Sequence, residues 1–272
     1  MKDYGKVSII TPSYNCIRYI GETIESIQNQ TYDNWELLIT DDCSSDGTFD
    51  LILQYAKEDE RIKCFSLAKN SGAGVARNNS IKMAKGKYIA FCDSDDRWLP
   101  TKLEKQLKLM EENKCGVVYS SYFVCNDNGL VKGIILCRKS ESSFSIKCDD
   151  KMGNLTFMYN EQLTGKLYMP DIRKRQDWAH KMAVMNICKT AYGVQEPLAI
   201  YRHSETSISK NKHSLVKYNI QGLMTLGWSK TKSILFFILF FMPCYIMKCI
   251  KRTMNNNKYK KLMYLIPREM IH

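Results

Sequence analysis

Three aspartates stand within four residues in the turn Asp93-Ser94-Asp95-Asp96, directly after the apolar run 88–92. Carboxylates this close repel one another, and the repulsion grows where the end of a strand shields them from water. A cation relieves it, and ligands that are all oxygen select a hard ion such as Mg²⁺ or Mn²⁺. The pattern therefore indicates a divalent-cation site that could also take a phosphate group. The alternative is a solvated turn or a helix N-cap.

Two further polar clusters follow apolar runs near the N-terminus. In the second of them Ser45 or Asp46 suits the N-cap of a helix. A cap does not require Asp42, whose carboxylate could accept a hydrogen bond from a nucleobase N–H. In the first cluster Pro12 fixes the backbone, and Tyr14 offers a ring that can stack on a base.

A fourth polar segment, Asn70-Ser71-Gly72-Ala73-Gly74, has glycines that permit a ligand to approach the backbone closely. Arg77 follows it and is placed to meet either a phosphate or the acidic turn. The segment is neither a P-loop nor a dinucleotide-binding fingerprint, because the required glycine and lysine spacings are absent. On its own it is also a common helix start.

Short apolar runs alternate with helical patterns over the first hundred residues. The repeated order strand, helix, strand favours parallel pairing with right-handed crossovers, and so an open α/β sheet. In such sheets ligands bind beyond the carboxyl ends of the strands, which is where the polar clusters fall. The predicted strands are 7–10, 35–39, 62–66 and 88–92, and the predicted helices are 17–30, 48–58 and 74–84.

The second half of the chain has a weaker pattern. Residues 99–113 are predicted as an amphipathic helix in which Pro100, near the start, costs little. A strand is predicted at 116–124 and a helix at 173–189. Residues 126–170 carry no clear periodicity and receive no assignment.

These segments, in this order and at this spacing, resemble family 2 glycosyltransferases over residues 1–115. The resemblance implies a GT-A fold, Rossmann-like with a mostly parallel central sheet. It also implies a nucleotide-sugar donor, usually a UDP-sugar, and direct inversion at the anomeric carbon. The matching strings are Val7-Ser8-Ile9-Ile10-Thr11-Pro12-Ser13-Tyr14-Asn15, Asp41-Asp42-Cys43-Ser44-Ser45-Asp46-Gly47-Thr48, Ala76-Arg77-Asn78 and Phe91-Cys92-Asp93-Ser94-Asp95-Asp96.

The same resemblance implies a role for individual residues of the donor site. Pro12 and Tyr14 would line the nucleotide pocket, and Asp42 would contact the uracil. Asp93 would lie near the ribose. Asp95 would hold the Mn²⁺ or Mg²⁺ that binds the diphosphate, and Arg77 would belong to the nucleotide-binding set.

Inverting transfer needs a base that takes the proton from the acceptor hydroxyl as it attacks. The family places a carboxylate for this at the start of a helix, often within Glu-Asp. Asp177 occupies that place here, preceded by Gln176, with Asp171 in reserve; a first-turn acid that complements the helix dipole is the alternative. Asp96 would contact the diphosphate or the acceptor, or else cap the next helix. Arg202 would assist the leaving group or form a surface ion pair.

The net charge of +12 is concentrated at the C-terminal end. From Lys210 onward there are twelve Lys or Arg against a single acid, Glu269, so this tail carries +11. Such an excess indicates a polyanionic partner, either membrane phospholipid or nucleic acid, and no nucleic-acid-binding module accompanies it. Eleven cysteines without a C-x-x-C pair, and no visible secretory signal, predict a reducing cytoplasmic location.

Within the tail, the segment 234–247 has fourteen uncharged residues framed by lysines, and includes Pro243, where a kink is expected. A helix of this length spans roughly 21 Å, short of the roughly 30 Å hydrocarbon core of a bilayer. We expect it to lie in the interface of an anionic membrane. A buried core helix and a full membrane span are the alternatives.

By analogy with similar bacterial enzymes, the sequence predicts a metal-dependent hexosyltransferase at the cytoplasmic face of the inner membrane, peripheral or monotopic. It would move glucose or galactose in β linkage from a UDP-sugar to a lipid-linked saccharide such as GlcNAc-diphospho-undecaprenol, for O-antigen or another surface polysaccharide. Residues 1–115 would bind the donor, 116–209 the acceptor and 210–272 the membrane. The rivals are a non-catalytic nucleotide-binding membrane protein and a metal-dependent phosphohydrolase.

Overall fold

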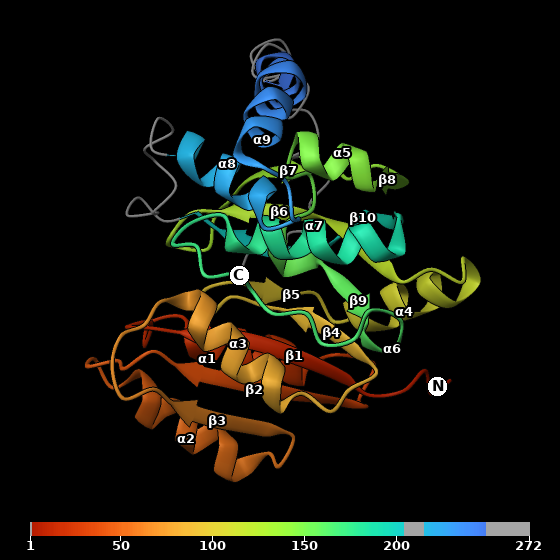
Figure 1. Ribbon diagram of the computed structural model, residues 1–272. Helices are drawn as coiled ribbons and strands as arrows, with labels where there is room; N and C mark the ends of the chain where they lie inside the picture. Colours follow the sequence, from red (N-terminus) through yellow and green to blue (C-terminus); the bar gives the residue numbers. More distant parts are fainter. Residues whose placement is uncertain (1, 204–214, 249–272) are drawn as a thin grey trace.

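The computed structural model describes residues 2–203 and 215–248 (Figure 1). Its strands are β1 (Val7–Ser13), β2 (Trp35–Asp41), β3 (Ile62–Ser66), β4 (Tyr88–Phe91), β5 (Arg97–Trp98), β6 (Val117–Cys125), β7 (Val131–Ile135), β8 (Ser140–Ser142), β9 (Met158–Asn160) and β10 (Thr190–Arg202). Its helices are α1 (Ile20–Gln28), α2 (Thr48–Glu58), α3 (Ala73–Met83), α4 (Lys102–Glu112), α5 (Ser143–Cys148), α6 (Glu161–Thr164), α7 (Gln176–Cys188), α8 (Leu215–Met224) and α9 (Lys230–Phe236). A 3₁₀ turn at Asn154–Thr156 and a π-helical turn at Phe237–Phe241 are also present.

The described strands form one sheet in the order β3-β2-β1-β4-β9-β6-β10-β5, with β7 on β6 and β8 on β10. Strands β3, β2, β1 and β4 run parallel, as do β6 and β10, and β9 joins the two groups antiparallel to β4 and β6. The predicted α/β sheet is therefore confirmed. It continues across residue 115, and the functional division there stays a prediction.

Successive side chains of the parallel strands pack on opposite faces of the sheet. Ile9 of β1 belongs to the core beneath α1 and α2, whereas Ile10 belongs to the core beneath α3 and α7. Every residue of β1 and β2 is buried, as expected for parallel strands that are covered on both faces. The result is a rigid support for the residues that follow the strands.

The strand register brings the polar clusters of the sequence to one edge of the sheet. Ser13 of β1 pairs with Asp41 of β2, and Ile10 of β1 pairs with Phe91 of β4. Because the three strands are parallel, the segments that follow them leave the sheet on the same side. The acidic turn therefore lies beside the other two clusters.

The predicted bounds of some helices and strands agree with the structure more closely than those of others. The predicted helix 48–58 and strand 62–66 have the predicted bounds. The predicted helix 99–113 begins only at Lys102, because Arg97 and Trp98 form β5 and pair with β10.

The unassigned region 126–170 contains β7, β8, α5, β9 and α6. Its strands are three to five residues long and pair with β6, β10 and β4, which lie elsewhere in the chain.

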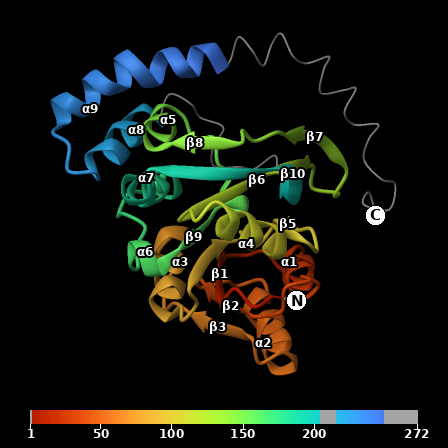
Figure 2. The same cartoon turned by 90° about the vertical axis from the view of Figure 1, so that its right-hand side faces the viewer.

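One continuous helix, Lys230–Lys248, crosses the end of the molecule opposite to α2 and β3 (Figure 2). It consists of α9, the π-helical turn and a final helical segment. The π-helical turn ends two residues before Pro243, whose ring would clash with the carbonyl four residues earlier in a regular α-helix. We attribute the wider turn to that clash, and the helix continues through Pro243.

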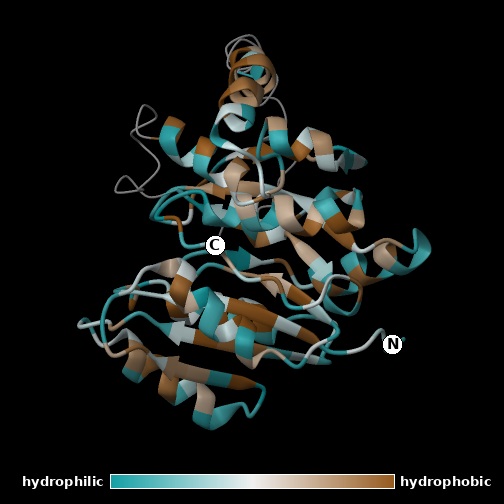
Figure 3. Cartoon of the chain, viewed as in Figure 1, coloured by the Kyte–Doolittle hydropathy of each residue, from teal (hydrophilic) through white to brown (hydrophobic). Residues whose placement is uncertain are grey.

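This helix is rich in apolar residues (Figure 3). One of its sides packs on the protein and the other is exposed. Phe241 is buried with its ring centroid 5.6 Å from that of Trp178 in α7. Leu239 is 61% exposed, and only 17% of the most apolar stretch is buried. The alternative of a buried core helix is therefore wrong for most of the segment. Its length and composition would also suit a membrane span, so interfacial attachment stays a prediction.

Part of the predicted tail lies outside the described residues. Residues 204–214 and 249–272 contain eight of its twelve basic side chains. The concentration of charge is therefore a property of the sequence, and four of the lysines have a described position.

Candidate active site

Arg77 connects the glycine-rich segment to the acidic turn. Its Nη2 donates a hydrogen bond of 2.6 Å to Oδ1 of Asp93, and the Asn154 amide lies 3.5 Å from the same oxygen. Of the two partners predicted for Arg77, the structure shows the acidic turn. The Arg77 side chain is 9% exposed, and its buried Nε has no hydrogen-bond partner among the described residues. The Nε–H donor of Arg77 is thus left without an acceptor among the described residues.

The Asp95 carboxyl is the acid of the turn that best suits a cation. Burial, together with the charge of Asp93, raises the pKa of Asp95 to about 6. A divalent ion would remove this penalty by stabilising the ionised form. The described residues contain no cluster of three acidic, histidine or cysteine ligands. A Mg²⁺ or Mn²⁺ ion held by one or two carboxylates and completed by a diphosphate and water needs no such cluster, so the turn fits the ion.

Asp96 faces the interior. It is 1% exposed, and its Oδ1 accepts a 3.0 Å hydrogen bond from the backbone N–H of Arg202. Burial, then the neighbouring charge of Asp95, raises the pKa of Asp96. The predicted cap is wrong, because α4 begins at Lys102 and Asp96 bonds to β10 instead. Its predicted contact with acceptor or diphosphate has no support in this geometry.

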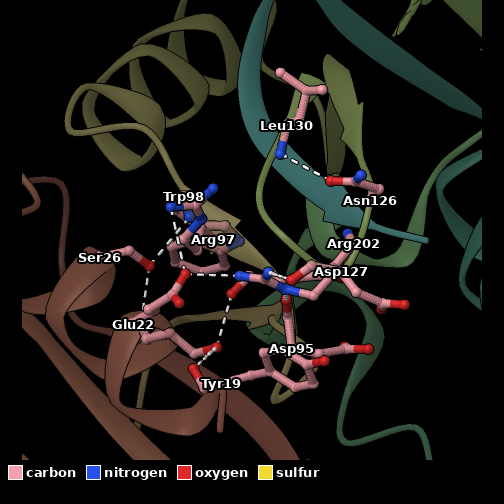
Figure 4. Close-up of polar contacts among 12 residues, drawn as sticks. Tyr19, Glu22, Ser26, Asp95, Arg97, Trp98, Asn126, Asp127, Leu130 and Arg202 are labelled. Carbon is pink, nitrogen blue, oxygen red and sulfur yellow. Dashed lines mark hydrogen bonds and ion pairs between the residues drawn. The ribbon is translucent and has the colours of Figure 1, made fainter. Parts of the chain in front are cut away.

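Arg202 supports the acidic turn from the side of β10 (Figure 4). Its Nε donates to the Asp95 carbonyl at 3.1 Å, its Nη1 to the Asp127 carbonyl at 2.7 Å and its Nη2 to Glu22 at 2.6 Å. The guanidinium carbon also lies 4.5 Å from the ring centre of Tyr19. The predicted ion pair is present, with Glu22, but Arg202 is 3% exposed, so its side of the pair is buried and not at the surface. Its predicted role at the leaving group stays untested.

Asp42 fixes the glycine-rich segment. Its two carboxylate oxygens accept hydrogen bonds from the backbone N–H groups of Ser71 and Gly72, at 2.6 and 2.7 Å. Gly72 has a φ of 93°, a conformation that favours glycine. Each carboxylate oxygen has a second acceptor site, so the predicted contact with uracil stays open. The bond to the segment itself was not foreseen from the sequence.

Pro12 and Tyr14 lie at the end of β1. Pro12 is buried opposite Thr40 of β2, and Tyr14 is 49% exposed. Beside them, Asn15 accepts a hydrogen bond from the backbone N–H of Ser45 at 2.9 Å, which joins the first two clusters. An exposed aromatic ring over a fixed backbone is compatible with the predicted nucleobase contact.

Asp177 lies in the first turn of α7, where a dense group of cations surrounds it. Burial alone would raise its pKa, but Lys181, Arg77 and Arg175 outweigh burial, and the pKa of Asp177 is lowered. Lys181 Nζ lies 3.6 Å from Asp177 Oδ2. Unlike a plain helix-dipole acid, Asp177 also lies in the electrostatic field of Arg77, which bonds Asp93 of the acidic turn. The reserve candidate Asp171 lies at an exposed position.

Gln176 joins the start of α7 to the start of α3. With its amide oriented to satisfy both neighbours, it accepts from the Gly74 N–H at 3.0 Å and donates to the Ile172 carbonyl at 2.9 Å. Arg175, the N-cap of α7, has a φ of 66° and bonds Asn219 of α8 at 2.8 Å. These contacts fix the direction in which α7 leaves the glycine-rich segment.

Arg77 therefore bonds Asp93 of the predicted donor site and acts electrostatically on the predicted base, Asp177. Two charged residues near Asp177, Asp150 and Lys181, were not predicted from the sequence. Lys181 follows Asp177 by four residues, a spacing that places both on one helix face and could have revealed it. Asp150 belongs to the unassigned region and carries no such signal.

Comparison with known proteins decides the family. The protein-family model described as glycosyl transferase family 2 matches residues 8–162 of this chain. The protein TuaG of Bacillus subtilis (strain 168), named as a glycosyltransferase of teichuronic acid biosynthesis, is 44% identical over 216 residues, which cover 78% of this chain and 84% of TuaG. The chain belongs to glycosyl transferase family 2. This confirms the family that the motifs predicted.

The name of a second relative states a donor, an acceptor and a linkage. WfgD of Escherichia coli, called a UDP-Glc:alpha-D-GlcNAc-diphosphoundecaprenol beta-1,3-glucosyltransferase, is 36% identical over 217 residues, covering 80% of this chain and 84% of WfgD.

Solved structures show the same fold. TarS of S. aureus, residues 1–349 in complex with UDP-GlcNAc, has a TM-score of 0.66 at 20% identity, covering 84% of this chain and 69% of TarS. The mannosyltransferase PcManGT of Pyrobaculum calidifontis, in complex with GDP-Man and Mn²⁺, has a TM-score of 0.58 at 14% identity, covering 93% of this chain and 76% of PcManGT. At these identities the likeness concerns the fold alone, and the predicted GT-A fold is confirmed.

Proposed function

We propose that this glycosyltransferase moves a hexose, glucose or galactose, from a UDP-sugar to a lipid-linked sugar such as GlcNAc-diphospho-undecaprenol, with inversion and formation of a β linkage. The product would enter O-antigen or another surface polysaccharide. The observation that carries the proposal is that Arg77 bonds Asp93 of the acidic turn and also acts electrostatically on Asp177. The names of WfgD and TuaG support a surface-polysaccharide substrate.

The donor would bind where β1, β2 and β4 end. Tyr14 stacks on the base and Asp42 accepts from it, while Pro12 shapes the pocket and Asp93 meets the ribose. TarS structures with UDP and with UDP-GlcNAc support a uridine nucleotide as donor.

Asp95 would hold Mn²⁺ or Mg²⁺, and a bound ion would supply positive charge to the departing diphosphate. The PcManGT complex with Mn²⁺ supports this choice of ion. Arg77, which bonds Asp93, adds a second cationic group beside the acidic turn.

Asp177 would act as the base. Its lowered pKa keeps it a carboxylate at neutral pH, ready to accept the proton of the acceptor hydroxyl as that oxygen attacks the anomeric carbon. The nucleoside diphosphate leaves from the opposite face of the sugar. Asp177→Asn would remove the proton acceptor while retaining the shape of the side chain.

The C-terminal helix would hold the enzyme at the cytoplasmic membrane face, peripherally or as a monotopic protein. Its outer side exposes Leu235, Ile238 and Leu239, and the exposed Phe144 of α5 extends this apolar surface through edge contacts with Phe240. Lysines at both ends of the helix suit anionic headgroups. Such a position brings the site to a lipid-linked acceptor.

The test is transfer to a synthetic GlcNAc-diphosphate-lipid acceptor with Mn²⁺, with each UDP-hexose in turn. We expect product from UDP-glucose or UDP-galactose, loss of product with a chelator, and a loss of about 100-fold or more in Asp177→Asn with UDP binding retained. Undiminished transfer by Asp177→Asn would overturn the assigned base. UDP binding without transfer from any UDP-hexose would favour the non-catalytic rival.

A further inference from the structure

Lys181 of α7 is buried although it carries a charge. It is 1% exposed, and its amine donates to Asp150 at 3.0 Å and to the Met152 carbonyl at 2.6 Å. Its remaining ionic contact is Asp177, 3.6 Å away. Of the three donors of the ammonium, two make these hydrogen bonds, and Asp177 lies just beyond hydrogen-bond distance. A buried amine is costly unless it is paired in this way.

We propose that Lys181 is a positioning residue for Asp177, and that Asp150 in turn fixes Lys181. This inference rests on the proposed function, in which Asp177 is the base. Asp177 and Lys181 are four residues apart on α7, so a cation fixed at the second position defines where the first carboxylate lies. Asp150 reaches the cation from the segment after α5. Two distant segments thus converge on one amine.

The geometry distinguishes the two carboxylates. Asp150 lies within hydrogen-bond distance of Lys181, whereas Asp177 is farther from the amine and has a side chain that is 33% exposed. Asp177 can therefore accept a proton from an incoming hydroxyl without losing a short bond to the protein. Asp150, with a side chain that is 15% exposed, is the structural partner.

Charged groups approach Asp177 from several elements. Arg175 and Lys181 come from α7, Arg77 comes from α3, and Asp150 opposes them from the segment after α5. The neighbouring His180 is neutral, because burial lowers its pKa to about 4. Removing Lys181 should therefore raise the pKa of Asp177, and removing the charge of Asp150 should lower it.

The experiment compares full-length Lys181→Met, Asp150→Asn and the double variant, with Lys57→Met on α2 as an exposed control. The Asp177 carboxyl is followed by ¹³C NMR, with its signal assigned by its absence in Asp177→Asn. We expect its pKa to rise by about one unit or more in Lys181→Met, to fall in Asp150→Asn and to stay unchanged in Lys57→Met. An unchanged pKa in Lys181→Met overturns the proposal, whether or not the protein transfers glucose.

Transfer from UDP-glucose separates positioning from a purely structural role. Lys181→Met alone leaves Asp150 buried and unpaired, so it should lose stability as well as activity. The double variant removes that unpaired charge and should recover much of the melting temperature. We expect kcat to remain lowered by about tenfold in the double variant, with little change in KM for the donor.

Recovery of both kcat and melting temperature in the double variant would overturn the proposal in favour of a structural ion pair. If the wild-type protein transfers no hexose, the proposed function fails, and the NMR titration still decides whether Lys181 controls Asp177.

Discussion

At the scale of single residues, Arg77 acts on two of the predicted site acids, since it contacts Asp93 and acts electrostatically on Asp177. An arginine that is paired on one Nη and unpaired on Nε can hold one acid while it receives a second anion. The acids near it consequently differ. The pKa of Asp177 is lowered beside cations, whereas burial and the charge of Asp93 raise the pKa of Asp95 to about 6.

Asp95→Asn should remove the metal-dependent part of UDP binding. We expect the dissociation constant for UDP in Mn²⁺ to rise about tenfold or more, because the ion loses its protein ligand. Calorimetric titration with and without a chelator measures this. Asp33→Asn, at an exposed position, is the matched control. Equal chelator sensitivity in Asp95→Asn and the wild type would contradict the assignment.

Lys102 should make the stability of the protein depend on pH. It is fully buried at the start of α4, where its amine lies 3.6 Å from the ring centre of Trp98, and burial lowers its pKa to about 7. In the unfolded chain the amine keeps its ordinary pKa, so folding becomes less favourable as pH falls from about 10.5 towards 7. Below 7 this group adds no further change.

Lys102→Met should therefore raise the melting temperature more at pH 7 than at pH 9.5, where the wild-type amine is already neutral in the folded state. Thermal unfolding at the two pH values is the measurement, and the exposed Lys57→Met should show no such difference. An equal effect at both values would mean that the amine is charged in its buried position.

At the scale of elements, the site depends on contacts between loops that follow different strands. The glycine-rich segment before α3 has its shape because Asp42, after β2, binds two of its N–H groups. The acidic turn after β4 is in turn supported by the last residue of β10. Donor-site geometry is therefore set by long-range bonds.

Asp42→Asn should weaken both folding and UDP binding. An amide offers one acceptor oxygen in place of two, so one of the N–H groups of Ser71 and Gly72 loses its partner. We expect a loss of about 1–3 kcal/mol in unfolding free energy by urea denaturation. Asp50→Asn in α2 is a control in the same half of the molecule. Unchanged stability would show that the bonds to the loop are exchangeable with water.

The sequence predicted those elements whose signals are local. Residues 48–58 could be placed from their helical pattern. The N-cap was predicted at Ser45 or Asp46 but is Gly47, although Asp46 does accept a hydrogen bond from the Thr48 N–H at 3.0 Å. Strands β8 and β9 could not be placed, because three residues carry no periodicity and their pairing partners lie in β10, β4 and β6.

The same limit applies to the site. Asp93, Asp95 and Asp177 could be selected because the family motif names their positions. The contacts of these acids could not be predicted, because they arise only in the three-dimensional fold. Asn154 approaches Asp93, Arg202 bonds the Asp95 carbonyl, and Asp150 bonds the Lys181 that neighbours Asp177. The inward direction of Asp96 had no sequence signal either, because it depends on a backbone bond from β10.

At the scale of the whole molecule, the exposed apolar face of the C-terminal helix predicts binding to lipid. Ile238→Glu with Leu239→Glu should release the full-length protein from vesicles that contain anionic phospholipid, because both side chains point away from the protein core. Leu163→Glu in α6 replaces a similarly exposed leucine away from the helix and is the control. Co-sedimentation measures the bound fraction, and release by the control alone would contradict the prediction.

The placement of this helix opposite α2 and β3 has a kinetic consequence (Figure 2). With the helix at a bilayer, the strands proposed to receive the nucleotide would face bulk water, whereas the proposed lipid-linked acceptor would arrive by diffusion within a plane. The donor would then reach the enzyme by three-dimensional diffusion in solution, and the acceptor by two-dimensional diffusion in the membrane. Turnover should respond to the number of acceptor molecules per unit area of membrane, and diluting the vesicles at constant composition should leave the rate per bound enzyme unchanged.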